Sequence, residues 1–470
     1  MSIKLDWQIE SEQTHTRATE DPLVRQRRRR AQRRFALLVL VMAGVLALIV
    51  ALVIWRLRSV DERLRKDLVR TVQAEIAALR VGDFANYMAI QRSASDAFMQ
   101  AQSRRFQDYQ QLKQAGRVQL SGDVVNVAID GRRGRVVLEE ELDGVPYRQV
   151  WFYWYYTDSG DGMGGWRHVP DDLTFWGAER TLDLPGGGSV RYRELDEPYA
   201  QAIAEALPNW WAELCAALRC DPPPPPQIEI VPQRPFALSW DGDGWTLRVS
   251  SPLVERVRAD APLPPNFAQA LVEALATRLV RYTAGDDPAP YYTDIAWLRA
   301  ELGRWAAAQV LGTAGSPFID SLSATFGPGA PLTLLSALTP TATLESALSA
   351  VTGVPMEQLS QDQLNSLAWG DFFQWRLALE PQLLVEGESN AFLALYAQED
   401  NYAASQAAIR LEDRRYALQP PPTVQSVLIT HERGRTFATV SAAHYDADGV
   451  LLQQQTIYWW LSGGTWRRLG

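Results

Sequence analysis

Two stretches of the chain decide the fold: "RGRVVLEEELDG" at residues 133–144 and "RGRTFATVSAAH" at residues 433–444. Apolar residues recur along both with a period near two, which predicts β-strands. "VWFYWYY" and "GWRHV" follow the first stretch, and "TIYWWL" and "TWRRL" follow the second in the same order. Arg133-Gly134-Arg135 corresponds to Arg433-Gly434-Arg435, and Trp166-Arg167 corresponds to Trp466-Arg467. The match predicts one α+β domain type that is used twice.

Helical runs precede both sets of strands. Residues 60–91 and 97–114 have helical periodicity before the first set, and residues 390–413 before the second. A short helical region, an antiparallel meander and a final Trp-Arg strand resemble the NTF2-like fold, in which a curved sheet wraps on helices to form a cone. The resemblance implies one cone at 56–172 and another at 386–470. It implies no particular activity, because that fold hosts enzymes, ligand carriers and interaction modules alike.

The segment "FALLVLVMAGVLALIVALVIW", residues 35–55, carries no charge and is about 30 Å long as a helix, which matches one hydrocarbon thickness. We predict a retained transmembrane helix rather than a cleaved signal peptide, because 34 residues precede it and no small-x-small site follows Trp55. Seven Arg lie between Arg25 and Arg34, whereas charges of both signs follow the segment. This bias places residues 1–34 in the cytoplasm and the rest of this single-pass chain outside the cell membrane.

Charge is unevenly distributed. The chain has a net charge of -9, but residues 1–55 hold 9 basic and 5 acidic side chains, which leaves -13 for the remainder. An acidic ectodomain argues against a nucleic-acid partner. The Arg-rich tail has a second interpretation, as a contact for nucleic acid or anionic lipid, although topology alone accounts for it.

Residues 173–385 begin with hairpin patterns and become almost entirely helical from Asn266 onward. "ALVEALATRLV" at 270–280 and "AWLRAELGRWAAAQV" at 296–310 lie where gluzincin metallopeptidases carry their His-Glu-x-x-His helix and their Glu-bearing helix. With the helical tail that follows, the region resembles the bacterial peptidase MA-like domains. The resemblance implies a mainly helical, gluzincin-like domain in a membrane-anchored bacterial protein. The alternative is that 267–280 is an ordinary amphipathic core helix.

The residues at the catalytic positions cannot bind zinc. Position by position, the two histidines are replaced by Val272 and Ala276, and the third ligand by Ala300. Glu273 keeps the place of the general base, and Glu301 is one residue away from the ligand position. The four histidines are His15, His168, His431 and His444, so none falls in this region. We therefore predict no metal, no cofactor and no peptidase activity.

The predicted function is protein or peptide binding, or scaffolding, at the outer membrane face by a vestigial peptidase cleft. The residues expected to line it are Val272, Glu273, Ala276, Trp297, Ala300 and Glu301. Two alternatives remain. One is a sensor that signals through the Arg-rich tail, and the other is an NTF2-like enzyme for a small molecule, which requires a polar, titrating cluster inside a cone.

Cys215 and Cys220 are the only cysteines. Five residues along a continuous helix turn two side chains about 140° apart, too divergent for a disulfide. If the helix frays before Asp221, closure becomes possible, so both a disulfide and two buried thiols remain open.

Overall fold

The computed structural model describes residues 22–469 apart from 158–163, 222, 243, 286–288, 340, 414 and 447–448, without the side chains of 22–37 and of Leu57. The first 21 residues of the predicted tail, His15 among them, therefore lie outside the described residues. The chain divides into two compact units. The first comprises residues 1–110, 126–136 and 152–170, and the second comprises 111–125, 137–151 and 171–470.

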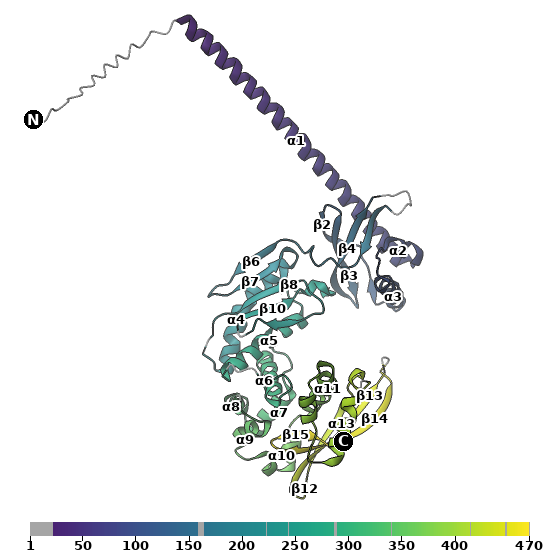
Figure 1. The fold of residues 1–470 in the computed structure, drawn as a ribbon, viewed down its shortest axis with the longest axis vertical. Helices are drawn as coiled ribbons and strands as arrows, with labels where there is room; N and C mark the ends of the chain where they lie inside the picture. The colour runs from purple at the N-terminus through teal and green to yellow at the C-terminus, as the bar shows by residue number, and fades with distance from the viewer. Residues whose placement is uncertain are drawn as a thin grey trace, which may run out of the picture. The chain divides into compact units, whose positions relative to one another are not determined.

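Helix α1 runs without interruption from Pro22 to Val81 and is the long rod in Figure 1. The large apolar side chains from Leu38 to Trp55 are exposed. Within the described part of the chain, one helix is long and apolar enough to cross a membrane, and it is this one. After Leu64 the helix buries an apolar face, which includes Leu68 and Val72. The candidate span and the first core helix are therefore one continuous element.

The first α+β part combines the end of α1 with two helices and a sheet. Its elements are α2 (Phe84–Ile90), α3 (Asp96–Gln114), β1 (Val118–Gln119), β2 (Val124–Asp130), β3 (Arg133–Leu142), β4 (Val145–Tyr156) and β5 (Gly165–Val169). The sheet order is β1-β3-β4-β11, where β11 is Val257–Arg258 from the middle region, with β2 paired to β3 and β5 paired to β4. Gly82, at φ +88°, ends α1, and the Asp83 side chain caps α2. A positive φ suits glycine there because it carries no β-carbon.

The middle region opens with a five-stranded sheet in the order β6-β7-β8-β10-β9, in which β8 is parallel to β7 and β10. Its elements are β6 (Glu179–Asp183), β7 (Ser189–Arg193), α4 (Glu197–Leu218), β8 (Gln227–Val231), β9 (Leu238–Trp240), β10 (Thr246–Ser250) and β11 (Val257–Arg258). The helices that follow are α5 (Pro265–Thr283), α6 (Asp294–Leu311), α7 (Pro317–Phe326), α8 (Ala330–Ala337), α9 (Leu344–Thr352) and α10 (Gln361–Ser366).

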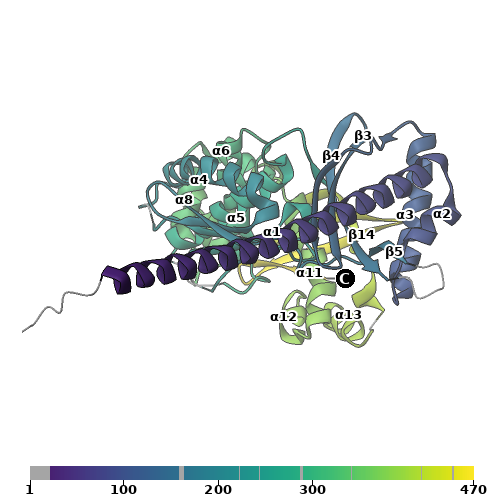
Figure 2. The same ribbon diagram turned by 90° about the horizontal axis from the view of Figure 1, so that it is seen from above.

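The second α+β part has the sheet order β12-β13-β14-β15. Its elements are α11 (Gly370–Glu386), α12 (Ser389–Ala394), α13 (Asn401–Glu412), β12 (Thr423–Glu432), β13 (Arg435–Tyr445), β14 (Leu451–Ser462) and β15 (Thr465–Arg468). Helices α12 and α13 lie together beside α11 in Figure 2. Side-chain amides cover the outer edge of β12, because Asn365 exchanges two hydrogen bonds with Ile429, and Gln374 bonds Val424 and Pro422.

One hydrophobic core extends from the middle sheet to the last sheet. Trp297 on α6 contacts Phe318, which contacts Trp369, and Trp369 contacts Trp466 on β15. The predicted boundary between 385 and 386 therefore does not separate two cores. Helix α11 ends at that boundary, but Phe372 contacts Trp297 on α6 and Phe373 contacts Trp466 on β15, so its side chains pack against both the middle helices and the last sheet.

The two α+β parts have equivalent features that the sequence match does not include. Glu75 on α1 and Glu380 on α11 are both fully buried, and each lies six residues before the end of its helix. Each helix ends at a glycine with a positive φ, Gly82 and Gly387. The parts therefore repeat the position of a buried carboxylate as well as the order of elements.

The last strand of each part also makes the same isolated bridge. Gln91 pairs in parallel with His168 on β5, and Tyr396 pairs in parallel with Arg468 on β15. Gln91 and Tyr396 each come 16 residues after the buried glutamate, whose carboxylate each side chain contacts. The shared bridge supports the predicted duplication at the level of backbone geometry.

Part of the sequence match is out of register. Trp166-Arg167 and Trp466-Arg467 occupy equivalent places in β5 and β15, but Arg133 and Gly134 lie inside β3, whereas Arg433-Gly434 forms the turn before β13. The counterpart of that turn is Gly131-Arg132, so the predicted Arg-Gly-Arg correspondence is wrong by two residues. A shift of two residues keeps every side chain on the same sheet face, so the alternating sequence pattern does not reveal the error.

A close approach between α5 and α6 gives a direct test of the packing in the middle region. A β-carbon at Gly303 would lie 2.3 Å from Thr277 Oγ1 and 3.0 Å from the Thr277 backbone. Gly303→Ala should therefore force α5 and α6 apart and cost about 1–3 kcal/mol of stability. The urea midpoint of the full chain in detergent measures this, with Gly329→Ala, which meets nothing within 4 Å, as the control. Equal midpoints for the two variants would contradict the close approach.

Candidate functional site

The positions of the missing zinc ligands on α5 lie in a closed pair of helices. Val272 and Ala276 have no exposed surface. Gly303 on α6 lies directly against the Thr277 backbone on α5, so the two helices are in close contact at this point. In the absence of a metal ligand at 272 and 276, apolar side chains there pack as ordinary core.

The two predicted glutamates lie in different surroundings. Glu273 is partly exposed and accepts a hydrogen bond from Gln269 Nε2 at 2.8 Å. Glu301 is fully buried, accepts a hydrogen bond from Ser316 Oγ at 2.6 Å and pairs with Arg304. Because the same Ser316 hydroxyl caps α7, Glu301 positions a helix and is not free for a ligand.

The six predicted cleft residues therefore do not line a common surface. Val272, Ala276 and Glu301 are buried completely, and only Trp297 and Ala300 border an open hollow. That hollow lies on another side of α6, where the helix meets α11 instead of α5. The sequence paired α6 with α5, and the two helices do pack together, but their interface is closed and the open hollow lies on the side of α6 that faces α11.

The open hollow, here called the α6–α11 groove, has a volume of about 490 Å³. It is lined by Tyr291, Ala296, Trp297, Ala300, Arg304, Asp371, Gln374, Trp375 and Ala378. Ala296, Ala300 and Arg304 are spaced by four residues on one helical face, and Ala378 opposes them from α11. The groove exists because small side chains stand where two packed helices usually place large ones.

The chemistry of the groove is amphipathic. Tyr291 is 40% exposed at the groove and its hydroxyl bonds Glu386, and Trp375 is partly exposed. Arg304 on α6 and Asp371 on α11 place opposite charges in the lining. Apolar walls with a few polar groups are typical of ligand sites, and the volume is in the usual range for them.

A buried ionic network fixes the two walls of the groove. Arg376 on α11 donates to Asp294 Oδ1 at 2.5 Å, at the start of α6, and to Thr465 Oγ1 at 2.6 Å, at the start of β15. Thr465 also bonds Asp294 directly. Arg376 and Asp294 are almost fully buried, so the network holds both helices to the last sheet and pre-forms the groove.

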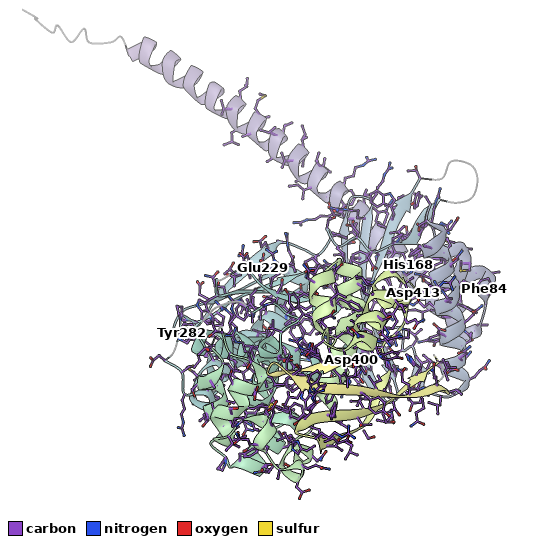
Figure 3. The ribbon with its side chains drawn as sticks, turned by 60° about the horizontal axis from the view of Figure 1, so that its bottom comes forward. Phe84, His168, Glu229, Tyr282, Asp400 and Asp413 are labelled. Carbon is purple, nitrogen blue, oxygen red and sulfur yellow. A yellow bond between two sulfur atoms is a disulfide. The ribbon has the colours of Figure 1, made fainter. Side chains whose placement is uncertain are left out.

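A second polar constellation, here called the Glu75 cluster, lies inside the first α+β part. Glu75 Oε1 lies 2.7 Å from His168 Nδ1 and accepts from Gln91 Nε2 at 2.8 Å. Its Oε2 accepts from the Tyr153 hydroxyl at 2.8 Å. His168, labelled in Figure 3, is 4% exposed, and Gln91 Oε1 is a buried acceptor with no hydrogen-bond partner. The cluster combines a carboxylate, an imidazole and a phenol in one enclosed place.

The second α+β part carries the counterpart, here called the Glu380 cluster. Both carboxylate oxygens of Glu380 accept from Arg468 at 2.7 Å, and Tyr396 donates at 2.9 Å. Tyr416 also donates, and Arg410 lies 3.8 Å away. Burial alone would raise the pKa of Glu380, but these partners outweigh it and hold the pKa below the ordinary range. A permanently charged arginine thus takes the place of His168.

The two cysteines form a disulfide. Helix α4 ends at Leu218, and Arg219 adopts a left-handed conformation, so Cys220 lies outside the helix. The turn brings the two Cα atoms within 5.1 Å. The fraying that the sequence left open therefore occurs, and it occurs before the proline run.

The remaining described histidines have local structural partners. His431 contacts the Leu359 carbonyl and Thr436, and His444 lies beside Gln455. Across the described residues, no three His, Cys, Asp or Glu side chains gather in a metal-binding arrangement.

Comparison with known proteins yields no family for this chain. No protein-family model matches it, and no curated protein matches it. The case for function therefore depends on the residues and their geometry alone.

The sequence contains a signal for the Glu75 cluster, although the sequence analysis did not predict the cluster. Leu68, Val72, Ile76 and Leu79 mark the buried face of α1, and Glu75 falls on that face. A charged residue at a core position is seldom found without a buried partner. The α11 wall of the groove had no such signal, because Asp371 and Ala378 are unremarkable on an amphipathic helix.

The Glu380 cluster predicts a defined pH response. Because the folded pKa of Glu380 is depressed, its contribution to stability is present above about pH 4.3, the unfolded value, and is lost as pH falls through the folded value. Glu380→Gln should flatten stability below about pH 4.3 and cost about 3–5 kcal/mol at pH 7, because Arg468 stays buried without its carboxylate.

Urea midpoints between pH 7 and pH 3.5 measure both effects. Glu412→Gln, at an exposed position on α13, is the control and should follow the wild-type curve. The double variant Glu380→Gln with Arg468→Met should recover part of the loss at pH 7. Parallel curves for wild type and Glu380→Gln at low pH would show that another group dominates.

Proposed function

We propose that this protein is a membrane-anchored, extracytoplasmic binding protein that captures a segment of a protein or peptide in the α6–α11 groove. The observation that carries the proposal is the groove itself, an open hollow with aromatic walls and opposite charges. An apolar side chain of the partner enters between Ala300 and Ala378, and flanking polar groups pair with Arg304 and Asp371. Aromatic and arginine side chains are the groups that most often dominate such interfaces.

The middle region is proposed as a degenerate peptidase MA-like domain without catalysis. Its support is the order of α5 and α6 and the residues at 272, 276 and 300, none of which has a side chain that binds a metal. The two α+β parts are proposed as NTF2-like duplicates. The equivalent bridges at Gln91 and Tyr396, and the equivalent buried glutamates, support common descent.

The anchor is proposed to be single-pass, with a cytoplasmic N-terminus in the cell membrane of a bacterium. Support for retention comes from the continuity of α1, which carries both the apolar span and the core residues Leu68 and Val72. Support for orientation comes from the Arg excess before residue 35.

One alternative function has a specific observation in its favour. The Glu75 cluster is a polar, titrating group inside the first α+β part, as an NTF2-like enzyme requires, and the unpartnered Gln91 Oε1 is a place for a substrate donor or a water. Glu75→Gln separates the cases, because an enzyme would lose turnover while groove binding persists. The sensor alternative has the continuity of α1 from Pro22 to Glu75 in its favour.

The groove proposal is tested by photo-crosslinking in cells. A benzoylphenylalanine at Ala300 should form a discrete protein adduct, and the same group at Ala408, exposed on α13, should not. Ala378→Phe fills the opposite wall and should weaken the Ala300 adduct about tenfold or more. An adduct that is indifferent to Ala378→Phe would place the partner outside the groove.

The anchor proposal is tested by mass and extraction. The mature protein should retain its full-length mass and resist alkaline carbonate extraction, because about 21 apolar residues in a helix bind the bilayer nearly irreversibly. A cysteine introduced at Val81 should react with an impermeant reagent added from outside, while Cys215 and Cys220 are protected by their disulfide. Loss of residues 1–55 from the mature chain would instead identify a signal peptide.

A further inference from the structure

We propose that the end of the first α+β part nearest the span docks onto anionic lipid headgroups of the membrane that anchors the chain. The inference rests on the proposed membrane anchor. The surface, here called the juxtamembrane rim, consists of the exposed charged residues of α1 from Arg56 to Asp67, the turn 130–133, the end of β4 at 155–157 and the start of β5 at 164–165. The sequence between these two strand ends, which includes Asp158 and Asp161, lies outside the described residues and is not part of the rim.

The position of the rim follows from the helix. Leu64 lies nine residues after Trp55, and at about 1.5 Å per residue its level is about 14 Å beyond the hydrocarbon edge. The headgroup layer occupies the first 5–8 Å or so of that distance. Because α1 is helical throughout this interval, no flexible linker separates the span from the folded part.

Contacts of Trp166, and of the residues packed around it, place the ends of β3, β4 and β5 near Leu64. Trp166 Nε1 donates to the Leu64 carbonyl at 3.0 Å, and a β-carbon at Gly134 would meet both Leu68 and Trp166 within 3 Å. Tyr155 packs against Trp166, and its N–H donates to the Arg132 carbonyl at 2.8 Å. The ends of β3, β4 and β5 therefore lie beside the point where α1 continues toward its span; Figure 1 shows β2 and β4 next to this part of α1.

The rim is basic, unlike the rest of the ectodomain. The described rim residues, 56–67 and 130–133 with 155–157 and 164–165, together contain seven Lys or Arg and four Asp or Glu. The acidic members are Asp61, Glu62, Asp67 and Asp130, of which Asp67 pairs with Arg70 and Asp130 with Arg133. Arg132 is exposed at the tip of the turn. The net positive charge stands out because residues after 55 carry -13 overall.

The rim also carries aromatic rings of the kind found at membrane–water interfaces. Trp154 is 39% exposed, Tyr155 and Tyr156 are partly exposed, and Arg92 lies 3.9 Å over the Tyr156 ring. Tyrosine, tryptophan and arginine together are the residues that membrane interfaces favour. An arginine side chain reaches several ångströms, and attraction to an anionic surface extends over a Debye length of about 8 Å, so Arg132 acts across the remaining gap.

The test uses the full chain in liposomes, either of phosphatidylcholine alone or with anionic phosphatidylglycerol. A spin label at Thr157→Cys, at the end of β4, reports on the rim, and the same label at Val81→Cys reports from the far end of α1. The native cysteines are joined and do not react. A nickel-chelating lipid relaxes only labels that approach the headgroups.

The rim label should be relaxed at least severalfold more than the Val81 label, and more strongly in anionic liposomes. Arg132→Glu should reduce the relaxation of the rim label about twofold or more in anionic liposomes and change it little in neutral ones. Arg132→Gln is the milder variant, and its unchanged melting temperature shows that the fold is intact. Equal relaxation at the two positions would overturn the proposal. Relaxation that does not depend on lipid charge would also overturn it, and an acidic protein would then be the favoured partner of the rim. Carbonate extraction of the same samples reports separately on anchoring.

Discussion

A glutamate with no exposed surface fastens the first helix of each α+β part to the last strand of its sheet. The partners are 93 residues apart in the first part and 88 in the second, so each cluster joins the ends of its part. A buried carboxylate costs several kcal/mol unless it is paired and fully hydrogen-bonded. Helix, bridge and final strand must therefore assemble together, and packings that leave the carboxylate unpaired are strongly disfavoured.

The two copies solve this constraint with different side chains. Glu380 is neutralised by Arg468, with two tyrosine hydroxyls and a second arginine nearby. Glu75 has a histidine, a tyrosine and a glutamine. The second solution is closed, because every carboxylate oxygen meets an arginine. The first leaves Gln91 Oε1, a buried acceptor, without a hydrogen-bond partner.

Sequence periodicity predicted the strands and helices of both α+β parts and the apolar segment of α1, because these patterns are local. It predicted the duplication through Trp166 and Trp466. It paired Arg433 with Arg133, two residues from the true counterpart, because a two-residue shift keeps the same alternation of inward and outward side chains. The site was the weakest prediction. Whether Ala300 faces α5 or α11 depends on packing between helices far apart in sequence, and Val272 and Ala276 read equally well as vestigial ligands or as core. The buried charges at Glu75 and Glu380, each on the apolar face of its helix, were the local signals of a buried polar cluster.

The amides that cover β12 have a consequence for the proposed membrane-anchored state of the chain. Proteins confined to a membrane plane meet one another at a high effective concentration, and an open strand edge is a template for edge-to-edge aggregation. Asn365 offers both an acceptor and a donor to Ile429, and Gln374 does the same for Val424 and Pro422, so these side chains imitate a neighbouring strand. Along that stretch the last sheet cannot recruit a strand from an adjacent molecule, and crowding in the plane leaves its four-stranded register undisturbed.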